Sequence, residues 1–319
     1  MESLVYILLA SYNGAQYIEK QLDSIIAQTH TNWCLLIRDD GSTDSTLSII
    51  KKYENSDDRI KIIDEDKAAK GNGACQNFAH LMEAAVAQKA SFIQFCDQDD
   101  YWFPNKVELM LKTIITTKSS MVYSDFLYAD EKLNKLTESV QKAKSSFAFP
   151  SFKNGIVQNH VYGCTMMIEG SLAKICLPIP EVAENHDYWI ALVASGIGAK
   201  IYHLEESLML YRQHSNNVTG SFKDHYILPR IERFLFRSSI LRKNELKKID
   251  MLKGLGEQLN EKLTVTNKSL LDGFFNALKK GNISIILYCM QNKIKRHSFI
   301  STVVYFITLC NLPKPLKNN

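Results

Sequence analysis

Residues 92–102 read FIQFCDQDDYW, a mostly apolar run that ends abruptly in a cluster of carboxylates. The apolar part has the length and composition of a strand buried on both faces, as strands of parallel sheets are. Carboxylates that follow such a strand lie at the edge of the sheet where open α/β folds bind their ligands. The stretch therefore predicts an α/β fold with a polar site at the carboxyl end of this strand.

The sequence on either side alternates between strand-like and helix-like patterns. Apolar runs predict further strands at residues 4–9, 33–37, 60–63 and 121–123, and helical spacing predicts helices at 17–26, 44–53, 74–88 and 104–117. Because strands connected through helices cross over with a right hand, we expect a mainly parallel, Rossmann-like sheet flanked by helices. Beyond residue 125 the pattern is looser, with strands predicted at 157–168 and 199–210 and a helix at 187–194.

The C-terminal third differs from the rest of the chain in charge. Residues 1–220 contain 20 basic and 27 acidic side chains, a net charge of −7, whereas residues 221–319 contain 18 and 7, a net charge of +11. From residue 224 onward the pattern is helical, with apolar spacing at 228–241 and 284–290. We therefore predict an α/β domain at 1–220 and a helical, basic region at 221–319. The basic region favours an anionic membrane surface over nucleic acid, because it has no basic stripe interleaved with aromatic residues.

The composition, 45% hydrophobic and 23% charged, excludes a disordered chain, a collagen-like fibre and a disulfide-dense miniprotein. The seven cysteines are odd in number and form no CxxC pair, as expected for reduced thiols in a cytoplasmic protein. No basic segment precedes the first apolar run, so we expect no signal peptide. The longest apolar stretch, at 299–312, is interrupted by polar residues and is too short to span a bilayer.

Asp97, Asp99 and Asp100 give the strongest chemical signal in the sequence. Three carboxylates within four residues repel one another, and they are costly at a buried strand end unless a cation or hydrogen-bond donors neutralise them. Oxygen ligands suit hard ions such as Mg²⁺ or Mn²⁺, which bind few carboxylates together with substrate phosphates. The alternative is a solvated acidic turn in which Asp100 caps the following helix.

The loops after the first two predicted strands can hold a nucleotide. Asp39 and Asp40 follow the strand at 33–37, and paired carboxylates there can accept hydrogen bonds from a base or a ribose. Tyr12, in the loop SYNG at 11–14, can offer a stacking face. The simpler alternatives are a strand-to-helix turn capped by Asp44 and a plain turn at 11–14.

Two further clusters lie in the looser part of the chain. Asp187, within ENHDYW at 184–189, can act as a general base near a sugar acceptor, or it can cap the predicted helix. Within YRQH at 211–214, Arg212 can pair with a phosphate and His214 can be a further metal ligand. The alternative for both residues is an ordinary surface position with no role in binding.

Other kinds of nucleotide site fit less well. The sequence has neither GxxxxGK(S/T) nor GxGxxG, and the loop after the first strand has no basic residue to hold a triphosphate. A phosphoacceptor receiver domain would have its acid pair after the first strand, where Ser11, Tyr12 and Asn13 stand in this chain. We therefore expect a nucleoside diphosphate that is bound through a metal ion.

Four motifs, in this order and spacing, carry a resemblance to a known family. They are ASYNG at 10–14, DDGSTD at 39–44, DQDDYW at 97–102 with PNK at 104–106, and HDYW at 186–189. With these motifs the chain resembles the family 2 glycosyltransferases over about residues 1–220, which implies the GT-A fold. The form CDQDD and the later YRQH are most similar to bacterial rhamnosyl- and glucosyltransferases that build surface polysaccharides.

The resemblance implies an inverting transfer of one sugar from a UDP- or dTDP-linked donor. It assigns Tyr12 and Asp40 to the base, Asp99 to the ribose, and the role of general base to Asp187. The divalent cation, Mg²⁺ or Mn²⁺, would be held by Asp97, Asp99, Asp100 and His214. The remaining contacts to the donor would come from Ala10, Asn13, Asp39, Asn77, Gly163 and Arg212.

The resemblance also implies a saccharide acceptor, lipid-linked, in the synthesis of O-antigen, capsule or another surface polysaccharide. A cytoplasmic enzyme peripheral at the inner face of the plasma membrane would fit Lys293, Lys295 and Arg296 beside the apolar stretch 299–312. The alternative for this region is a helical cap with a solvated basic face. The motif QxxRW and the membrane spans of processive synthases are absent, which favours addition of a single sugar. Two other interpretations stay open: a non-catalytic nucleotide-sugar-binding or scaffold subunit of a polysaccharide assembly complex, and a nucleotidyltransferase.

Overall fold

The computed structural model of the chain describes residues 3–63, 73–136, 151–214 and 238–312. Most of the helix predicted at 228–241 lies outside these residues. None of the seven cysteines, all of which lie within them, forms a disulfide.

A single mixed sheet of eight strands forms the centre of the α/β unit, in the order β3-β2-β1-β4-β7-β6-β8-β5. The half from β3 to β4 is parallel, and β6 also pairs with β8 in parallel, whereas β7 and β5 run antiparallel to their neighbours. The strands are β1 (Val5–Ser11), β2 (Trp33–Asp39), β3 (Ile60–Ile62), β4 (Phe92–Asp97), β5 (Tyr101–Trp102), β6 (Met121–Ala129), β7 (Met166–Glu169) and β8 (Ile201–Arg212). The predicted α/β fold is confirmed, and the antiparallel β5 and β7 are the additions that make the sheet mixed.

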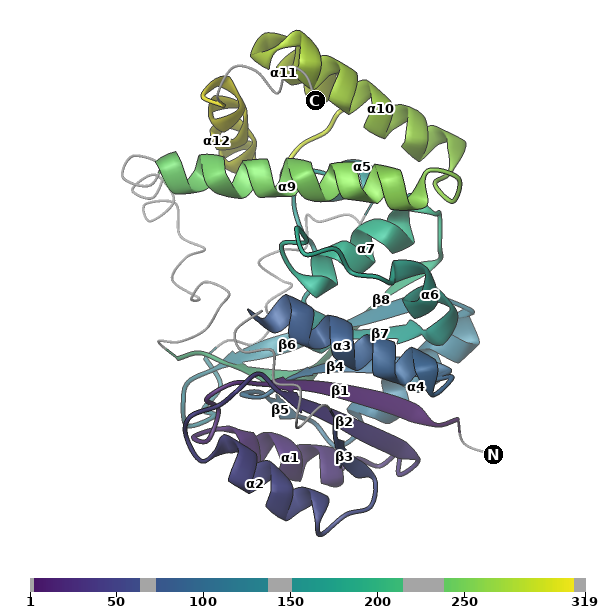
Figure 1. The fold of residues 1–319 in the computed structure, drawn as a ribbon, viewed down its shortest axis with the longest axis vertical. Coiled ribbons are helices and arrows are strands. Elements are labelled where there is room, and N and C mark those ends of the chain that lie inside the picture. The colour runs from purple at the N-terminus through teal and green to yellow at the C-terminus, as the bar shows by residue number, and fades with distance from the viewer. Residues whose placement is uncertain (1–2, 64–72, 137–150, 215–237, 313–319) are drawn as a thin grey trace.

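Helices cover both faces of the sheet (Figure 1). One layer consists of α1 (Ile18–Ile26), α2 (Thr46–Glu54) and α4 (Lys106–Thr117), and the other of α3 (Gly73–Ala87), α6 (Gly170–Cys176) and α7 (His186–Gly196). Strand β1 shows why its sequence is continuously apolar. Its Tyr6 and Leu8 pack into the core with α3, whereas Ile7 and Leu9 pack into the core with α1.

The strand predicted at residues 157–168 is wrong over most of its length. The structure has the short helix α5 (Phe152–Gly155), an irregular segment, a 3-10 turn (Gly163–Thr165) and only then β7. Side chains satisfy the backbone in the irregular segment and at the start of the 3-10 turn, because Val161 N donates to Asn159 Oδ1 and Gly163 N donates to Asp187 Oδ2. A strand ladder would compete for these same N–H groups.

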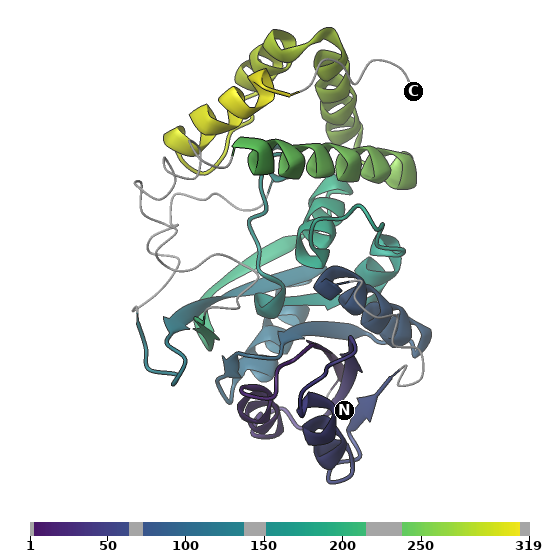
Figure 2. The same ribbon diagram turned by 60° about the vertical axis from the view of Figure 1, so that its left-hand side comes forward.

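The C-terminal region is helical, as predicted, and stacks beyond α5 and α7 (Figures 1 and 2). Its helices are α9 (Ser238–Leu259), α10 (Val265–Lys280), α11 (Asn282–Gln291) and α12 (Phe299–Cys310). The buried side chains Leu252, Leu255 and Phe274 belong to the same hydrophobic core as α7. The amide of Asn267 donates to the carbonyls of Ser195 and Gly196 at 3.0 and 2.9 Å. The helices therefore pack as part of one body with the sheet, and the division at residue 220 stays a prediction.

Side-chain caps explain where two of these helices begin. Thr264 accepts a hydrogen bond from Asn267 N before α10, and Ser298 accepts one from Ser301 N before α12. Among the helices of the described ranges, none combines the length and the apolar character that crossing a bilayer requires.

Candidate active site

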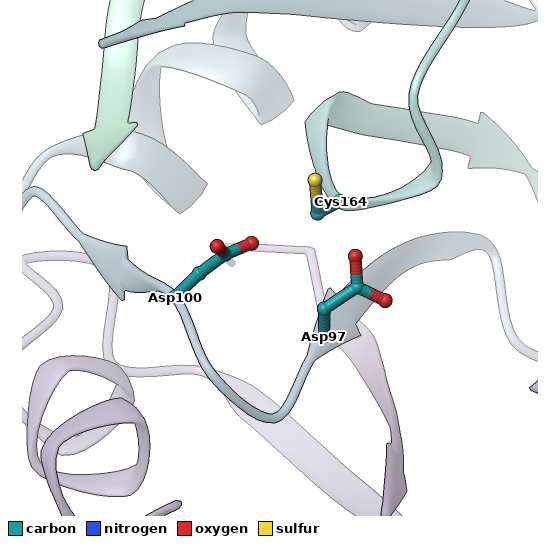
Figure 3. A group of neighbouring side chains, drawn as sticks. All are labelled: Asp97, Asp100 and Cys164. Atoms are coloured by element: carbon teal, nitrogen blue, oxygen red, sulfur yellow. The ribbon is translucent and has the colours of Figure 1, made fainter. Parts of the chain in front are cut away.

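Two carboxylates and a thiol converge at the carboxyl end of β4 (Figure 3). Asp97 is the last residue of β4, Asp100 directly precedes β5, and Cys164 lies in the 3-10 turn before β7. One ligand atom of each residue lies within 4.8 Å of the others. Asp100 is buried, and its Oδ1 accepts a hydrogen bond from Arg212 N at 3.2 Å. Its Oδ2 is also buried and has no hydrogen-bond partner.

This acidic pair is poorly neutralised by the protein itself. Burial, with the charges of Asp99 and Asp187, raises the pKa of Asp97 to about 7. Burial and the other carboxylates raise the pKa of Asp100 well above its ordinary value. The donor set of two carboxylate oxygens and one sulfur, with one buried oxygen unpartnered, fits a divalent cation.

The fully buried Lys106, part of the motif PNK at 104–106, is a positive group beside the acidic pair. Its Nζ donates to the carbonyl of Cys164 at 2.6 Å and lies 4.3 Å from the ring centroid of Trp102. Burial lowers the pKa of Lys106 to about 8, although the charges of Asp100 and Asp97 oppose this shift. Lys106 therefore holds the turn that carries Cys164 and offsets part of the negative charge.

The four predicted metal ligands fall into two groups. Asp97 and Asp100 face Cys164, whereas Asp99 Oδ2 lies 2.7 Å from Nε2 of His214. The His214 ring stacks on Tyr17 with centroids 4.6 Å apart. The structure therefore places Asp99 and His214 beside the acidic pair as a partnered couple, and their roles as ligands stay predictions.

Arg212 lies buried between these two groups. Its Nε donates to the carbonyl of Asp99 at 2.6 Å, and its guanidinium also bonds the carbonyl of Glu131. The guanidinium carbon lies 4.9 Å from the ring centroid of Tyr17. These contacts make Arg212 a brace for the acidic turn, and its predicted contact to a donor phosphate stays a prediction.

Gln98 ties the acidic turn to the loop after β1, a role that the sequence did not reveal. Its Oε1 accepts from Tyr12 N and its Nε2 donates to the Tyr12 carbonyl, both at 2.9 Å. A Cβ on Gly14 would lie 2.1 Å from Gln98 Oε1, so a larger residue there would displace the Gln98 amide from Tyr12. The Tyr12 side chain is 54% exposed, which leaves its ring available for stacking.

Asp39 and Asn13 build the loop in which they stand. Asp39 accepts hydrogen bonds from the backbone N–H groups of Gly41 and Ser42 and from the hydroxyls of Ser42 and Ser11. Asn13 Oδ1 accepts from Thr43 N at 2.8 Å. Their predicted contacts to the donor stay predictions, and the structure shows both side chains already engaged in the loop.

Asp40, by contrast, keeps an unused acceptor. Its Oδ2 accepts from Gly73 N at 3.3 Å, and its buried Oδ1 has only Arg38, 3.5 Å away, as an ionic neighbour and no hydrogen bond. The side-chain oxygen of Asn77 accepts a hydrogen bond from the same Arg38 guanidinium at 3.0 Å, so Asn77 contacts Arg38. Ala10 stands opposite Asp97 in the strand register, so its backbone borders the acidic pair.

Asp187 lies in the first turn of α7, after the N-cap residue Asn185. Its Oδ2 accepts from Gly163 N at 2.9 Å, and its Oδ1 accepts from Asn159 Nδ2 at 3.1 Å and from Tyr188 N at 2.6 Å. Burial nevertheless raises the pKa of Asp187 to about 6. Its charge contributes to the raised pKa of Asp97, so both carboxylates belong to one electrostatic site.

His186, next to this aspartate, is a packing residue. Its ring lies 4.0 Å from that of Phe78 and 5.1 Å from that of Phe95, and its Nε2 has no hydrogen-bond partner. Burial lowers the pKa of His186 to about 3, so the ring is neutral at physiological pH. A Cβ on Gly163 would lie 2.4 Å from His186 Nε2, which explains the glycine in the turn that contacts Asp187.

Comparison with known protein families identifies the family of this chain. The family model of glycosyl transferase family 2 matches residues 6–176, more than half of the chain. The chain is a member of glycosyltransferase family 2. The matched part covers nearly all of β1, the whole of β2 and β4, and the loops that follow these three strands.

Two relatives of this glycosyltransferase have descriptions that name a sugar donor. The dTDP-rhamnosyl transferase RfbG of Shigella flexneri is 30% identical over 230 residues, which cover 68% of this chain and 76% of RfbG. The UDP-Glc:alpha-D-GlcNAc-diphosphoundecaprenol beta-1,3-glucosyltransferase WfaP of Escherichia coli is 29% identical over 224 residues, which cover 69% of this chain and 82% of WfaP.

Solved structures give the same fold. TarS of S. aureus, in complex with UDP, matches with a TM-score of 0.55 at 17% identity, over 86% of this chain and 70% of that one. The mannosyltransferase PcManGT of Pyrobaculum calidifontis, in complex with GDP-Man and Mn²⁺, matches with a TM-score of 0.52 at 14% identity, over 96% and 85%. Membership of the family, the GT-A fold and the similarity to a rhamnosyl- and a glucosyltransferase are thus confirmed, and the roles of individual residues stay predictions.

Proposed function

We propose that this glycosyltransferase is a metal-dependent inverting enzyme that transfers one sugar from a UDP- or dTDP-linked donor to a lipid-linked saccharide. The observation that carries the proposal is the half-buried Asp97 and the buried Asp100, which share negative charge with Asp187 at one end of the sheet. A pair of this kind is costly for the folded protein unless it binds a cation, and the family to which the chain belongs acts on sugars.

The nucleoside would bind between the first two loops. The exposed ring of Tyr12 offers a stacking face, and the free Oδ1 of Asp40 offers an acceptor. Uracil and thymine both present an N–H at the position where cytosine presents a bare nitrogen, so an acceptor favours UDP or dTDP over CDP. The relatives RfbG and WfaP, whose descriptions name dTDP and UDP donors, support this choice.

Asp97, Asp100 and Cys164 are the residues that would hold the divalent cation, Mg²⁺ or Mn²⁺, with Asp99 and His214 as further candidates. When bound, the cation neutralises the negative charge that develops on the departing diphosphate. Mn²⁺ suits a mixed oxygen and sulfur set better than Mg²⁺, which prefers oxygen alone.

Asp187 would serve as the general base. The acceptor hydroxyl attacks the anomeric carbon from the face opposite the diphosphate, its proton passes to the Asp187 carboxylate, and the carbon–oxygen bond to the diphosphate breaks. One displacement inverts the configuration and needs no second nucleophile. A pKa of about 6 leaves Asp187 ionised at neutral pH while it remains basic enough to accept a proton.

The proposed acceptor is inferred from the relatives. WfaP is described as acting on a saccharide linked to diphosphoundecaprenol, a membrane lipid. A lipid-linked acceptor would place this chain at the cytoplasmic face of the plasma membrane, within synthesis of a surface polysaccharide.

The first experiment is a thermal-shift measurement with UDP, dTDP and CDP, each with MnCl₂ or with EDTA. We expect UDP or dTDP to raise the Tm only with Mn²⁺, and Asp100→Asn to abolish the rise. The exposed acid Asp58 provides the matched control, because Asp58→Asn should leave the rise unchanged. No rise with any diphosphate would contradict the proposal.

The second experiment separates an enzyme from a binding subunit. Release of UDP or dTDP from UDP-glucose, UDP-N-acetylglucosamine or dTDP-rhamnose is measured with a lipid extract as the source of acceptor. Asp187→Asn should lower turnover by roughly 10²–10⁴-fold and leave the nucleotide-dependent Tm rise intact. Binding without turnover in the unmodified protein would instead favour the scaffold subunit.

A further inference from the structure

Helix α11 leaves an apolar stripe open to solvent. Ile283, Leu287 and Met290 stand at helical spacing on one side of the helix and are all exposed, Ile283 to 75%. On the other side Ile285 and Cys289 are fully buried against the rest of the molecule. The helix is thus already anchored, and its exposed stripe contributes nothing to the described core.

Helix α12 repeats the arrangement beside it. Phe299, Val303 and Ile307 are exposed, Phe299 to 83%, whereas Tyr305 and Leu309 are buried. The two helices pack on each other at the end of the molecule that lies furthest from α1 and α2 (Figures 1 and 2). We call these six exposed apolar residues the α11–α12 face. Large exposed apolar residues on two adjacent helices indicate an interaction surface.

The segment of the chain that carries the α11–α12 face is basic. Residues 273–319 contain seven Lys and Arg residues and no Asp or Glu. Lys279 and Lys280 end α10, Lys293 and Lys295 lie between α11 and α12, and all four side chains are exposed. Arg296 is the exception among the neighbouring cations, because it pairs with the buried Glu245 at 2.9 Å. An apolar face flanked by four exposed lysines is complementary to an anionic lipid surface.

We propose that the α11–α12 face docks on an anionic phospholipid bilayer. The apolar residues would enter the boundary between headgroups and acyl chains, and the four lysines would meet lipid phosphates. In both views α12 lies on the same side of the molecule as the carboxyl end of β8, where Arg212 borders the acidic turn (Figures 1 and 2). Docking would bring the active site to a lipid-linked acceptor, and this benefit depends on the proposed function. Binding of the face to lipid does not depend on it.

Co-sedimentation with vesicles tests the proposal directly. We expect the full chain to bind vesicles of phosphatidylcholine mixed with phosphatidylglycerol and to bind pure phosphatidylcholine far more weakly. Phe299→Glu should weaken partitioning by about tenfold or more, because it puts a charge in place of an apolar side chain that would be buried in the bilayer. Ile115→Glu is the matched control, since Ile115 is also exposed but lies on α4 in the opposite helix layer. It should bind like the unmodified protein.

The contribution of the lysines to lipid binding is tested separately. Lys293→Gln with Lys295→Gln should weaken binding to the anionic vesicles by about fivefold per lysine and reduce the dependence on salt. The pair Lys61→Gln and Lys112→Gln removes the same charge from exposed positions elsewhere and should change little.

Several outcomes would overturn the proposal. Binding that Phe299→Glu leaves unchanged, or no binding to any vesicle, would do so. A dimer seen by light scattering that Phe299→Glu converts to a monomer would assign the face to a second copy of the chain. Because the metal-dependent Tm rise with UDP or dTDP is recorded on the same samples, loss of lipid binding is distinguishable from loss of the nucleotide site.

Discussion

The side-chain amide of Asn159 donates a hydrogen bond of 3.1 Å to the carboxylate of Asp187. Gly163 N and Tyr188 N donate to the same carboxylate, and each donor favours its ionised form. The three bonds thus oppose the burial that raises the pKa of Asp187. Asn159 is itself fixed, because its Oδ1 accepts from Val161 N at 3.1 Å. It is therefore a positioning residue for the proposed base.

We expect Asn159→Ala to move the pH dependence of turnover. Loss of one donor raises the pKa of Asp187 above about 6, so the acid limb of the kcat/KM profile should shift upward by roughly half to one pH unit. Turnover should recover at higher pH. A purely structural role would lower turnover equally at every pH. Asn55→Ala, at the exposed end of α2, is the control that should leave the limb in place.

The position of the acidic pair was predictable because it depends on local pattern. The apolar runs at 4–9 and 92–96 became β1 and β4, and the rule that ligands bind at the carboxyl ends of parallel strands placed Asp97 there. The start of the helix that carries Asp187 was likewise predicted from the pattern, whereas its role as general base came from the resemblance and stays a prediction. Both inferences need only neighbouring residues and the alternation of elements.

The contacts around these acids were predicted only in part, because their partners come from distant parts of the chain. The resemblance placed His214 at the acidic cluster as a metal ligand, but not as the partner of Asp99 across 115 residues, and no pattern indicated that Lys106 reaches the carbonyl of Cys164 across 58. No periodicity in the sequence encodes such contacts. The predicted strand at 157–168 failed for a related reason, since Asp187 captures the backbone N–H of Gly163 there.

We expect Mn²⁺ to bind more tightly as the pH rises through 7. The pKa of Asp97 is about 7 without the ion, so a metal must displace a proton below that pH. Between pH 8 and pH 6 the Kd measured by titration should rise about tenfold from this group alone. The ion-free protein should show the opposite trend, because a carboxyl whose folded pKa is raised loses stability as pH rises from about 4 towards 7.

Asp97→Asn supplies the comparison for this measurement. It removes the titrating group, so the remaining affinity for Mn²⁺ should vary less with pH, and the ion-free protein should lose less stability as pH rises. Asp58→Asn, at an exposed site, should behave like the unmodified protein. An affinity that does not change between pH 6 and pH 8 would refute the assignment of the ion to this pair.

We expect Cys164→Ser to change which ions the site prefers. A sulfur ligand favours soft ions, so the unmodified protein should bind Cd²⁺ with an ultraviolet charge-transfer band from thiolate to metal. The serine variant should lose this band while Mg²⁺ and Mn²⁺ still raise the Tm. Cys310 is the exposed thiol, and Cys310→Ser should retain the band. A band of equal strength in Cys164→Ser would exclude the Cys164 sulfur as a ligand.

His186 should make the protein sensitive to acid. Its folded pKa of about 3 lies below the ordinary value of about 6.5, so the unfolded chain binds a proton that the folded protein does not. This contribution to the free energy of unfolding is complete above pH 6.5 and is lost as pH falls, by about 2 kcal/mol at pH 5.

Urea unfolding at pH 7.5 and pH 5 checks this contribution. The free energy of unfolding should differ less between the two pH values for His186→Leu than for the unmodified protein. The altered side-chain shape of leucine affects stability at both pH values alike and leaves their difference informative. His80→Gln, at an exposed position on α3, should keep the full difference, and an unchanged difference in His186→Leu would show that His186 is not the acid-sensitive group.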